Sequence, residues 1–407
     1  MSFRIDTHIL SQLIIDPIPA VNPDSFSPVE WKLILQSAQR EGVGPLLYWR
    51  LSKSGKFASL SEDVRNSLRA MYSSAWRQNQ KIFKELEVLT RLFNQAEIPV
   101  VVLKGACFAL TIYPDVGLRP MGDLDLLLPK AKLAQAVQIA KMIGYVDTLP
   151  EATTGLNDLL SHHVFLQKMD AQPFTLEMHY SLVADKSFTY AVPVDWFWSQ
   201  TEPLGGLSQT RFENLLMLSP AAQILYAAAH AMLQHGGKNT LLRWYYDLDL
   251  LVRYYGDRID WGLLLSQAEN FEWGSALDAA LSQTCIYFNT PVPVHVRARL
   301  SERPDRHQKL VDFLKTKPDT HILEERQKLL SLNWYGRFRL VLALIFPNPG
   351  YMRWRYQLTT PWALPAHYLM RWWGIGMDFF PTMVSFLRKT RPVDQQPAES
   401  APHKNRE

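Results

Sequence analysis

The amino-acid sequence predicts an α+β fold, in which a small mixed β-sheet lies between an N-terminal and a C-terminal helical unit. Both outer regions carry apolar residues at helical spacing, whereas the region between them carries short β-branched or alternating runs separated by Gly, Pro and Asp. The length of 407 residues exceeds that of a single domain, typically roughly 100–200 residues. We therefore predict five parts: a helical unit over residues 1–95, a mixed α/β core over 96–217, a second helical unit over 218–333, a basic aromatic segment over 334–391 and a disordered tail over 392–407.

Capping residues and apolar spacing predict the helices of the two outer units. Ser27, Pro28 and Glu30 form a capping-box sequence with proline in the first turn, so a helix begins there, and Gly42 ends it. A longer helix is predicted over residues 61–95, because its apolar residues recur on one face. Helical spacing returns in the second unit, with helices predicted over residues 220–234, 241–255, 261–269 and 276–288.

The core begins with a β-branched run over residues 98–103 that is too short for an independent helix and ends at Lys104 and Gly105. A second strand is predicted over residues 123–128, where aspartates alternate with leucines before a proline. The remaining predicted elements of the core are helices over residues 106–113 and 131–143 and strands over residues 163–169 and 174–179.

Composition and cysteine content exclude several classes of protein. With 47% hydrophobic and 20% charged residues, the chain has ample apolar surface to bury, which excludes a wholly disordered or collagen-like protein. Cys107 and Cys285 cannot build a disulfide framework and lack metal-ligand spacing, so a reducing compartment is favoured. The N-terminus does not resemble a secretory signal, and no apolar run approaches the ~18–20 residues that span a bilayer. We therefore expect a cytoplasmic protein without a transmembrane helix.

The positive charge of the chain is concentrated near its C-terminal end. Residues 334–391 contain eight Lys or Arg, one acid and fourteen aromatic residues. This composition is typical of a peripheral membrane contact, and it also suits binding of single-stranded nucleic acid by stacking and charge. A third interpretation is an aromatic cap that packs over the helical unit. The sequence leaves the three alternatives open, and membrane association is the one that would modify the cytoplasmic localisation.

Three carboxylates carry the strongest functional signal. Asp123 and Asp125 lie at positions i and i+2 of a predicted strand, so both side chains project from the same face. Glu177 alternates with apolar neighbours in the later hairpin and can bring a third carboxylate to the same edge. Carboxylates at this spacing repel one another unless a cation lies between them. Mg²⁺ is the natural partner, with Mn²⁺ as the alternative, because these ions prefer oxygen ligands and phosphate, and such sites perform nucleotidyl transfer.

Lys104, Gly105 and Arg119 are the candidate nucleotide-binding residues. The glycine that follows the first strand lets backbone N–H groups approach a phosphate, and Lys104 can add a charge to a triphosphate. For Lys104, the alternative is a structural ion pair with one of the two aspartates. Arg119 can likewise bind a substrate or pair with a carboxylate in a structural role.

Histidines form a second group of candidates. His179 shares a face with Glu177, and we expect it to orient the carboxylates by hydrogen bonding rather than to form a zinc site with His162 and His163, whose spacing is unspecific. Four residues of the second helical unit can line a cleft opposite the sheet, with helix packing or capping as the alternative: His230, His235, Arg243 and Asp247.

Several short motifs together resemble the uncharacterised bacterial nucleotidyltransferases of the DNA polymerase β-like superfamily. The resemblance covers roughly residues 25–330 and implies a nucleotidyltransferase fold with Asp123, Asp125 and Glu177 as metal ligands and Gly105 beside the nucleotide phosphates. One departure is that the usual glycine-serine pair of the superfamily is Lys104-Gly105 here, so the hydroxyl that ordinarily meets a phosphate is missing. The motifs that carry the resemblance are Leu103-Lys104-Gly105, Tyr113-Pro114, residues 118–127, Gly144-Tyr145, residues 176–179 and residues 242–248.

These observations lead us to expect a Mg²⁺-dependent nucleotidyltransferase that moves a nucleoside monophosphate from ATP or another nucleoside triphosphate to an unidentified acceptor, with release of pyrophosphate. Three rivals remain. One is a nucleotide-binding pseudo-enzyme that acts as a scaffold in a biosynthetic complex, and another is a toxin-like enzyme that modifies tRNA or protein. The third is a glycosyltransferase that uses Asp-x-Asp to hold Mn²⁺ and a nucleotide-sugar, which would require an N-terminal series of strands and helices.

Overall fold

The chain of the computed structural model divides into two units, Met1–Leu149 with Asn157–Arg337, and Pro150–Leu156 with Phe338–Glu407. The predicted tail over residues 392–407, the turn before residue 174 and His162 lie outside the described residues. The described residues are 7–15, 22–147, 163–168, 174–182, 193–204, 212, 214–235, 240–302, 334–335, 338, 342, 345–358 and 360–374.

Two of the N-terminal helices form where the sequence predicts them. Ser27 and Glu30 make the reciprocal hydrogen bonds of a capping box at the start of α2 (Pro28–Arg40). Ser61 is the N-cap residue of α4 (Glu62–Gln95), the longest helix described, whose buried residues recur at helical spacing along one face. The other two helices of this region are α1 (Thr7–Ile14) and α3 (Gly44–Lys53).

A mixed sheet of seven strands forms the centre of the first unit, in the order β3-β4-β5-β2-β1-β7-β6. β2 pairs in parallel with β5 and antiparallel with β1, and β1 in turn pairs in parallel with β7. The α+β fold class is therefore confirmed, whereas the sequence did not predict β3, β6 and β7. The strands are β1 (Val100–Val102), β2 (Asp123–Leu127), β3 (Tyr145–Asp147), β4 (His163–Lys168), β5 (Thr175–His179), β6 (Thr201–Pro203) and β7 (Leu215–Leu218).

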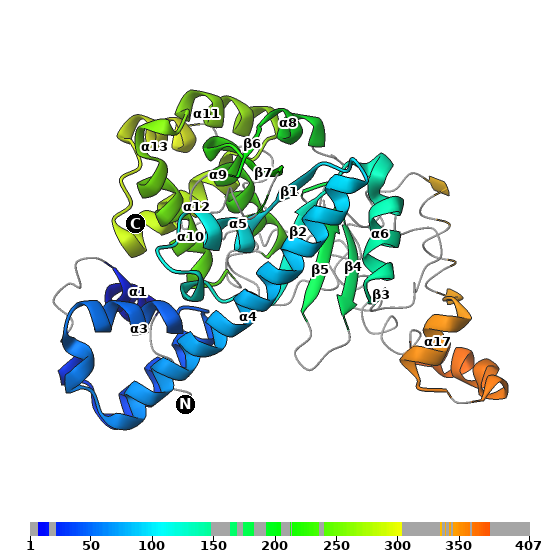
Figure 1. The fold of residues 1–407 in the computed structure, drawn as a ribbon, viewed down its shortest axis with the longest axis horizontal. Coiled ribbons are helices and arrows are strands. Elements are labelled where there is room, and N and C mark those ends of the chain that lie inside the picture. Colours follow the sequence, from blue (N-terminus) through cyan, green and yellow to red (C-terminus); the bar gives the residue numbers. More distant parts are fainter. Residues whose placement is uncertain are drawn as a thin grey trace, which may run out of the picture. The chain divides into compact units, whose positions relative to one another are not determined.

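Helices flank the sheet, and α4 runs past its central strands (Figure 1). The remaining described helices of the unit are α5 (Lys104–Thr111), α6 (Leu133–Met142), α8 (Val194–Ser199), α9 (Pro220–Ala229), α10 (Leu242–Tyr255), α11 (Trp261–Asn270), α12 (Gly274–Phe288) and α13 (Val294–Glu302). The helix predicted over residues 220–234 differs in one respect, because its last turn, η6 (His230–Gln234), is π-helical.

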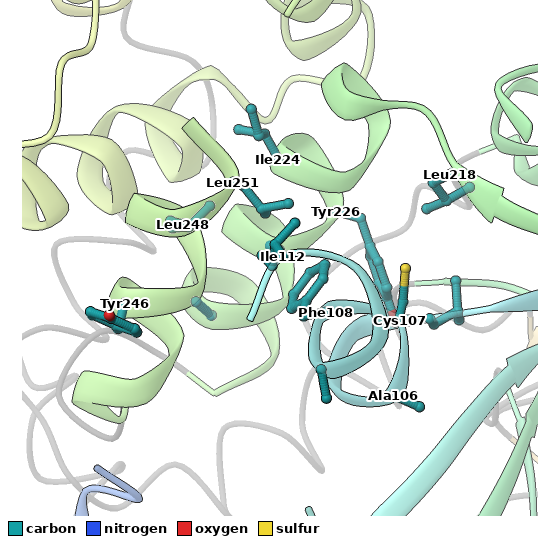
Figure 2. Close-up of a cluster of buried hydrophobic side chains, with 14 of the residues drawn as sticks. Ala106, Cys107, Phe108, Ile112, Leu218, Ile224, Tyr226, Tyr246, Leu248 and Leu251 are labelled. Atoms are coloured by element: carbon teal, nitrogen blue, oxygen red, sulfur yellow. The ribbon is translucent and has the colours of Figure 1, made fainter. Parts of the chain in front are cut away.

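Helix α5 is held by apolar side chains between the sheet and the C-terminal helices. Figure 2 shows Cys107 and Phe108 of α5, with Ile112 directly after the helix, among side chains of α9 and α10, including Tyr226 and Leu251. All of these side chains are buried. Exposing their apolar surface to water would cost about 25 cal/mol of free energy per Å². The packing fixes the start of α5 relative to the strands.

The second unit contains α17 (Pro349–Arg355) and exposes several large aromatic side chains, among them Trp362 and Trp373. Membrane or nucleic-acid contact through residues 334–391 stays a prediction. Among the described residues, no helix has the length and apolar character needed to cross a bilayer.

Asn79 fixes the loop that precedes β2. Its side chain is fully buried on α4 and donates hydrogen bonds to the carbonyl oxygens of Val116, at 2.5 Å, and Arg119, at 2.8 Å. An Asn79→Ala substitution leaves both carbonyls without this donor, so we expect a loss of about 1–3 kcal/mol in the free energy of unfolding, measured by urea denaturation. The control is Asn66→Ala on the exposed face of the same helix, expected to change stability by less than about 0.5 kcal/mol. Equal stability of both variants would contradict this role of Asn79.

Candidate active site

Two neighbouring strands bring the three predicted carboxylates to one face of the sheet. Asp123 and Asp125 lie two residues apart on β2, and the parallel register of β2 and β5 pairs Asp125 directly with Glu177. Residues paired across parallel strands project from the same face, so Glu177 lies beside Asp125. Leu124 and Leu126, which alternate with the two aspartates along β2, are fully buried. The alternation that the sequence predicted therefore separates the apolar from the acidic face of β2.

Asp125 is buried, and interactions with Lys104 and His179 compensate its negative charge. Lys104 Nζ lies 3.3 Å from Asp125 Oδ1, and His179 Nε2 lies 2.8 Å from the same oxygen. Burial alone would raise the pKa of Asp125, but the Lys104 ammonium and the hydrogen bond with His179 outweigh burial and hold the pKa well below its usual range. Asp125 is thus ionised, and the interaction with Lys104 and His179 offsets the cost of burying its charge.

The other two carboxylates are less well compensated. Burial, followed by repulsion from Asp125, raises the pKa of Asp123 above its ordinary value. Burial also raises the pKa of Glu177, although its carboxylate lies 3.3 Å from His179 Nε2. Burial disfavours charge on His179 itself, but its bonds to Asp125 and Glu177 prevail, and they raise its pKa. A further cation near Asp123 would favour its ionised form.

The position of Lys104 follows from the backbone of β1 and β2. The N–H of Leu103 donates to the carbonyl of Asp125 at 3.0 Å, so the next residue begins α5 directly beside the acidic face. Lys104 has φ = 36°, a left-handed conformation that a non-glycine residue adopts at a cost of about 1–3 kcal/mol. Its ammonium also lies 5.5 Å from the centre of the Tyr226 ring. The structural ion pair considered for Lys104 is therefore present, and its partner is Asp125.

A cavity of about 110 Å³ opens beside the two aspartates. Both predicted aspartates and all three predicted nucleotide-binding residues line it, whereas Glu177 lies outside its lining. The four helical residues expected to line a cleft also face this cavity, together with three that the sequence did not single out: Phe108, Ala227 and Trp244. Their apolar character is indistinguishable in the sequence from that of core residues.

Arg119 is clamped by Asp247 rather than by the acidic strand. Its guanidinium donates to both carboxylate oxygens, with Nη2 to Oδ2 at 2.8 Å and Nε to Oδ1 at 3.0 Å, and Tyr113 donates a third hydrogen bond to Asp247. Both charged groups are almost completely buried. This bidentate ion pair joins the loop before β2 to α10, 128 residues away in the sequence.

The absence of a side chain at Gly105 leaves room for Arg119. A Cβ at Gly105 would lie 2.6 Å from Nη1 of Arg119, so any larger residue would displace the guanidinium. This close approach is a structural reason for glycine at this position. The role predicted for Gly105 and Arg119 in binding phosphate stays a prediction.

A π-helical turn contributes His230, and His235 directly after it, to the wall of the cavity. In η6 the N–H of His235 donates to the carbonyl of His230, five residues back, which brings the two imidazoles to one side with their Nε2 atoms 3.1 Å apart. Trp244 of α10 packs against both rings, at centroid distances of 5.2 Å and 4.5 Å. Burial, followed by the positive charge of Lys104, holds the pKa of His230 well below its usual range. His230 is therefore neutral.

Among the described residues, one group of three side chains could bind a metal ion: His163, Glu177 and His179. Their potential donor atoms lie within 4.8 Å of one another. Asp123 and Asp125 do not belong to this group. The face of the sheet thus presents two adjacent sets of ligands, an aspartate pair at the cavity and a mixed set around Glu177.

Comparison with known proteins gives one match. A family model described as "Uncharacterised nucleotidyltransferase" matches residues 27–289, which span the sheet, α9, α10 and the cavity. Neither the curated proteins nor the solved structures contain a match to the chain.

The ion pair between Arg119 and Asp247 generates a prediction about stability. An Asp247→Asn substitution removes the carboxylate and leaves the Arg119 charge buried, so we expect a loss of about 3–5 kcal/mol in the free energy of unfolding, measured by chemical denaturation. Asp257→Asn, at an exposed position just after the same helix, is the control and should cost less than about 0.5 kcal/mol. An Asp247→Asn protein as stable as the control would show that Arg119 is not held by this pair.

Proposed function

The chain belongs to the uncharacterised nucleotidyltransferase family, and from this membership we propose that it transfers a nucleoside monophosphate from a nucleoside triphosphate to an acceptor hydroxyl or phosphate. The acceptor oxygen forms a bond to the α-phosphorus, the bond from that phosphorus to the β-phosphate oxygen breaks, and pyrophosphate leaves with the acceptor's proton lost to solvent. The observation that carries the proposal is the pair Asp123 and Asp125 at the wall of a cavity that Lys104 also lines.

The aspartate pair fits a divalent metal ion such as Mg²⁺, with Mn²⁺ as the alternative. Both ligands are carboxylates, the donors that Mg²⁺ prefers, and the partly compensated Asp123 has a raised pKa, which a nearby cation would lower. We propose that Asp123, Asp125 and Glu177 hold the metal. When bound, such ions activate the acceptor hydroxyl and neutralise the charge that develops on pyrophosphate.

Lys104 is the proposed ligand of the triphosphate. The residue lines the cavity, and its ammonium interacts with Asp125 at 3.3 Å; a divalent ion held by that carboxylate would leave the ammonium available to a phosphate. Arg243 adds a second positive charge to the lining, and its Nη1 donates to the carbonyl of Pro120 at 2.8 Å. These two charges support an anionic substrate more directly than Arg119, which Asp247 already neutralises.

The size of the cavity limits how the substrate lies. Its volume of about 110 Å³ is smaller than the roughly 300–1,000 Å³ of pockets that enclose a drug-sized ligand. A nucleoside triphosphate therefore binds with its phosphates in the cavity and the rest extending beyond it, past the exposed His235 and the partly buried Trp244. Aromatic and imidazole rings at that position suit a planar nucleobase or an acceptor ring.

The fold argues against the glycosyltransferase alternative. That alternative requires an N-terminal series of strands and helices, whereas the described residues before β1 form helices and no strand. A pseudo-enzyme scaffold would bind nucleotide without turnover, so it is distinguished only by assay. A toxin-like activity on tRNA or protein is one choice of acceptor for the same chemistry.

The proposed activity is tested by incubating the full chain with each of the four α-labelled nucleoside triphosphates, Mg²⁺ and a panel of small-molecule acceptors, tRNA and cell lysate. We expect label to move to one class of acceptor, and Asp123→Asn or Asp125→Asn to reduce transfer by at least about 100-fold, because the metal loses a charged ligand. Asp147→Asn, at an exposed ion pair with Lys141, is the matched control and should keep full activity. Nucleotide binding without transfer to any acceptor would favour the scaffold.

The dual role proposed for Lys104 gives a prediction in which two affinities move in opposite directions. Lys104→Met removes the cation that competes with a metal at Asp125, so Mn²⁺ alone should bind more tightly, while a non-hydrolysable triphosphate should bind about tenfold or more weakly without the charge-assisted contact. Isothermal titration calorimetry measures both. Lys141→Met on α6 is the control for charge alone, and a variant in which both affinities fell together would contradict the exchange.

A further inference from the structure

His163, Glu177 and His179 lie on one face of two antiparallel strands. The register of β4 and β5 places His163 directly opposite His179, and Glu177 lies two residues from His179 on the same face of β5. The two imidazole rings pack at a centroid distance of 4.9 Å. The register of the strands therefore brings two nitrogen donors and one carboxylate together. The spacing of these three residues in the sequence did not predict this proximity.

The donor atoms of these three side chains are already near the separation that a metal ion requires. They lie within 4.8 Å of one another. Zinc bound at about 2.0–2.2 Å by each of three tetrahedral ligands needs donor atoms about 3.3–3.6 Å apart. Side-chain rotations would therefore have to bring the three donor atoms slightly closer together. His179 is 1% exposed and the other two are partly buried, which limits competition from water.

Glu177 is shared by this group and the proposed metal site of the two aspartates, since it is paired in register with Asp125 and each of its two carboxylate oxygens can bind a different ion. Glu177 lies outside the lining of the cavity that Asp123 and Asp125 face, and its carboxylate is 3.3 Å from His179. Asp125 makes its own contact with His179, at 2.8 Å. Both carboxylates thus contact the same ring nitrogen of His179, so an ion bound through Nε2 would replace the contact with Asp125.

We propose that His163, Glu177 and His179 form a transition-metal site, of which Zn²⁺ is the occupant, beside the aspartate pair at the cavity. Imidazole donors favour Zn²⁺ and its neighbours in the first transition row over Mg²⁺, which prefers oxygen ligands alone. Three protein ligands of the His₂Glu type leave a fourth position open, as in zinc sites that bind water or substrate. The site goes beyond the proposed nucleotidyl transfer and does not require a nucleotide.

The arrangement therefore has two sets of ligands with different metal preferences. The oxygen-only pair Asp123 and Asp125 suits Mg²⁺, while the mixed set suits Zn²⁺. Glu177 lies between the two sets, paired in register with Asp125 and in contact with His179. An ion held by the mixed set would add positive charge near Asp125 without occupying the cavity.

The test uses Co²⁺ as a spectroscopic substitute for Zn²⁺ in the full-length chain, titrated in a large excess of Mg²⁺ without nucleotide. The wild-type protein should bind one Co²⁺ with visible ligand-field absorption, and His163→Ala or His163→Asn should weaken binding by about tenfold or more. Gln167→Ala is the matched control, because Gln167 lies on the same face of β4 and outside the ligand group. Circular dichroism checks that each variant is folded.

Three outcomes would overturn the site: Co²⁺ displaced by the excess of Mg²⁺, His163 variants that bind Co²⁺ as tightly as wild type, or Co²⁺ binding lost in Asp123→Asn and kept in His163→Ala. The test is separate from that of the proposed function. Asp123→Asn should retain Co²⁺ while losing transfer, so a chain that binds Co²⁺ through His163 but transfers no label would refute only the enzymatic proposal.

Discussion

The buried charge of Asp125 is the constraint on which the rest of the site depends. A carboxylate at this depth is tolerated only if positive charge and hydrogen bonds offset the loss of water, and Lys104 and His179 provide both. The strained backbone of Lys104 persists because this interaction and the packing of α5 hold it in place. If Lys104 exchanges its partner as proposed, its ammonium would link the proposed metal ligands to an anionic substrate.

The surrounding fold positions these groups by joining distant segments. Asp247 of α10 holds the Arg119 side chain before β2, Asn79 of α4 donates to the backbone of the same loop, and Gly105 makes room for the guanidinium. The cavity consequently has one wall from the sheet and another from the C-terminal helices. The family match spans both the sheet and those helices.

The sequence predicted what local patterns determine. Alternation of Asp and Leu in β2 and the capping box at Ser27 are visible over a few residues, and both are confirmed. Strands β3, β6 and β7 were missed, because each is only three or four residues long and is stabilised by its neighbours in the sheet. Arg119 pairs with Asp247 through a tertiary contact, and His163 lies close to Glu177 because of the strand register. Neither proximity can be predicted from the local spacing of residues in the sequence.

The central claim is that Asp123 and Asp125 hold a divalent metal while Lys104 contacts the nucleotide phosphates. Anomalous diffraction from a crystal containing Mn²⁺ and a non-hydrolysable nucleoside triphosphate tests it most directly. The account predicts an anomalous peak between the two aspartate carboxylates, with the triphosphate in the cavity and Lys104 moved from Asp125 onto a phosphate. A nucleotide bound elsewhere, or no peak at the aspartates with Lys104 still paired to Asp125, would contradict it.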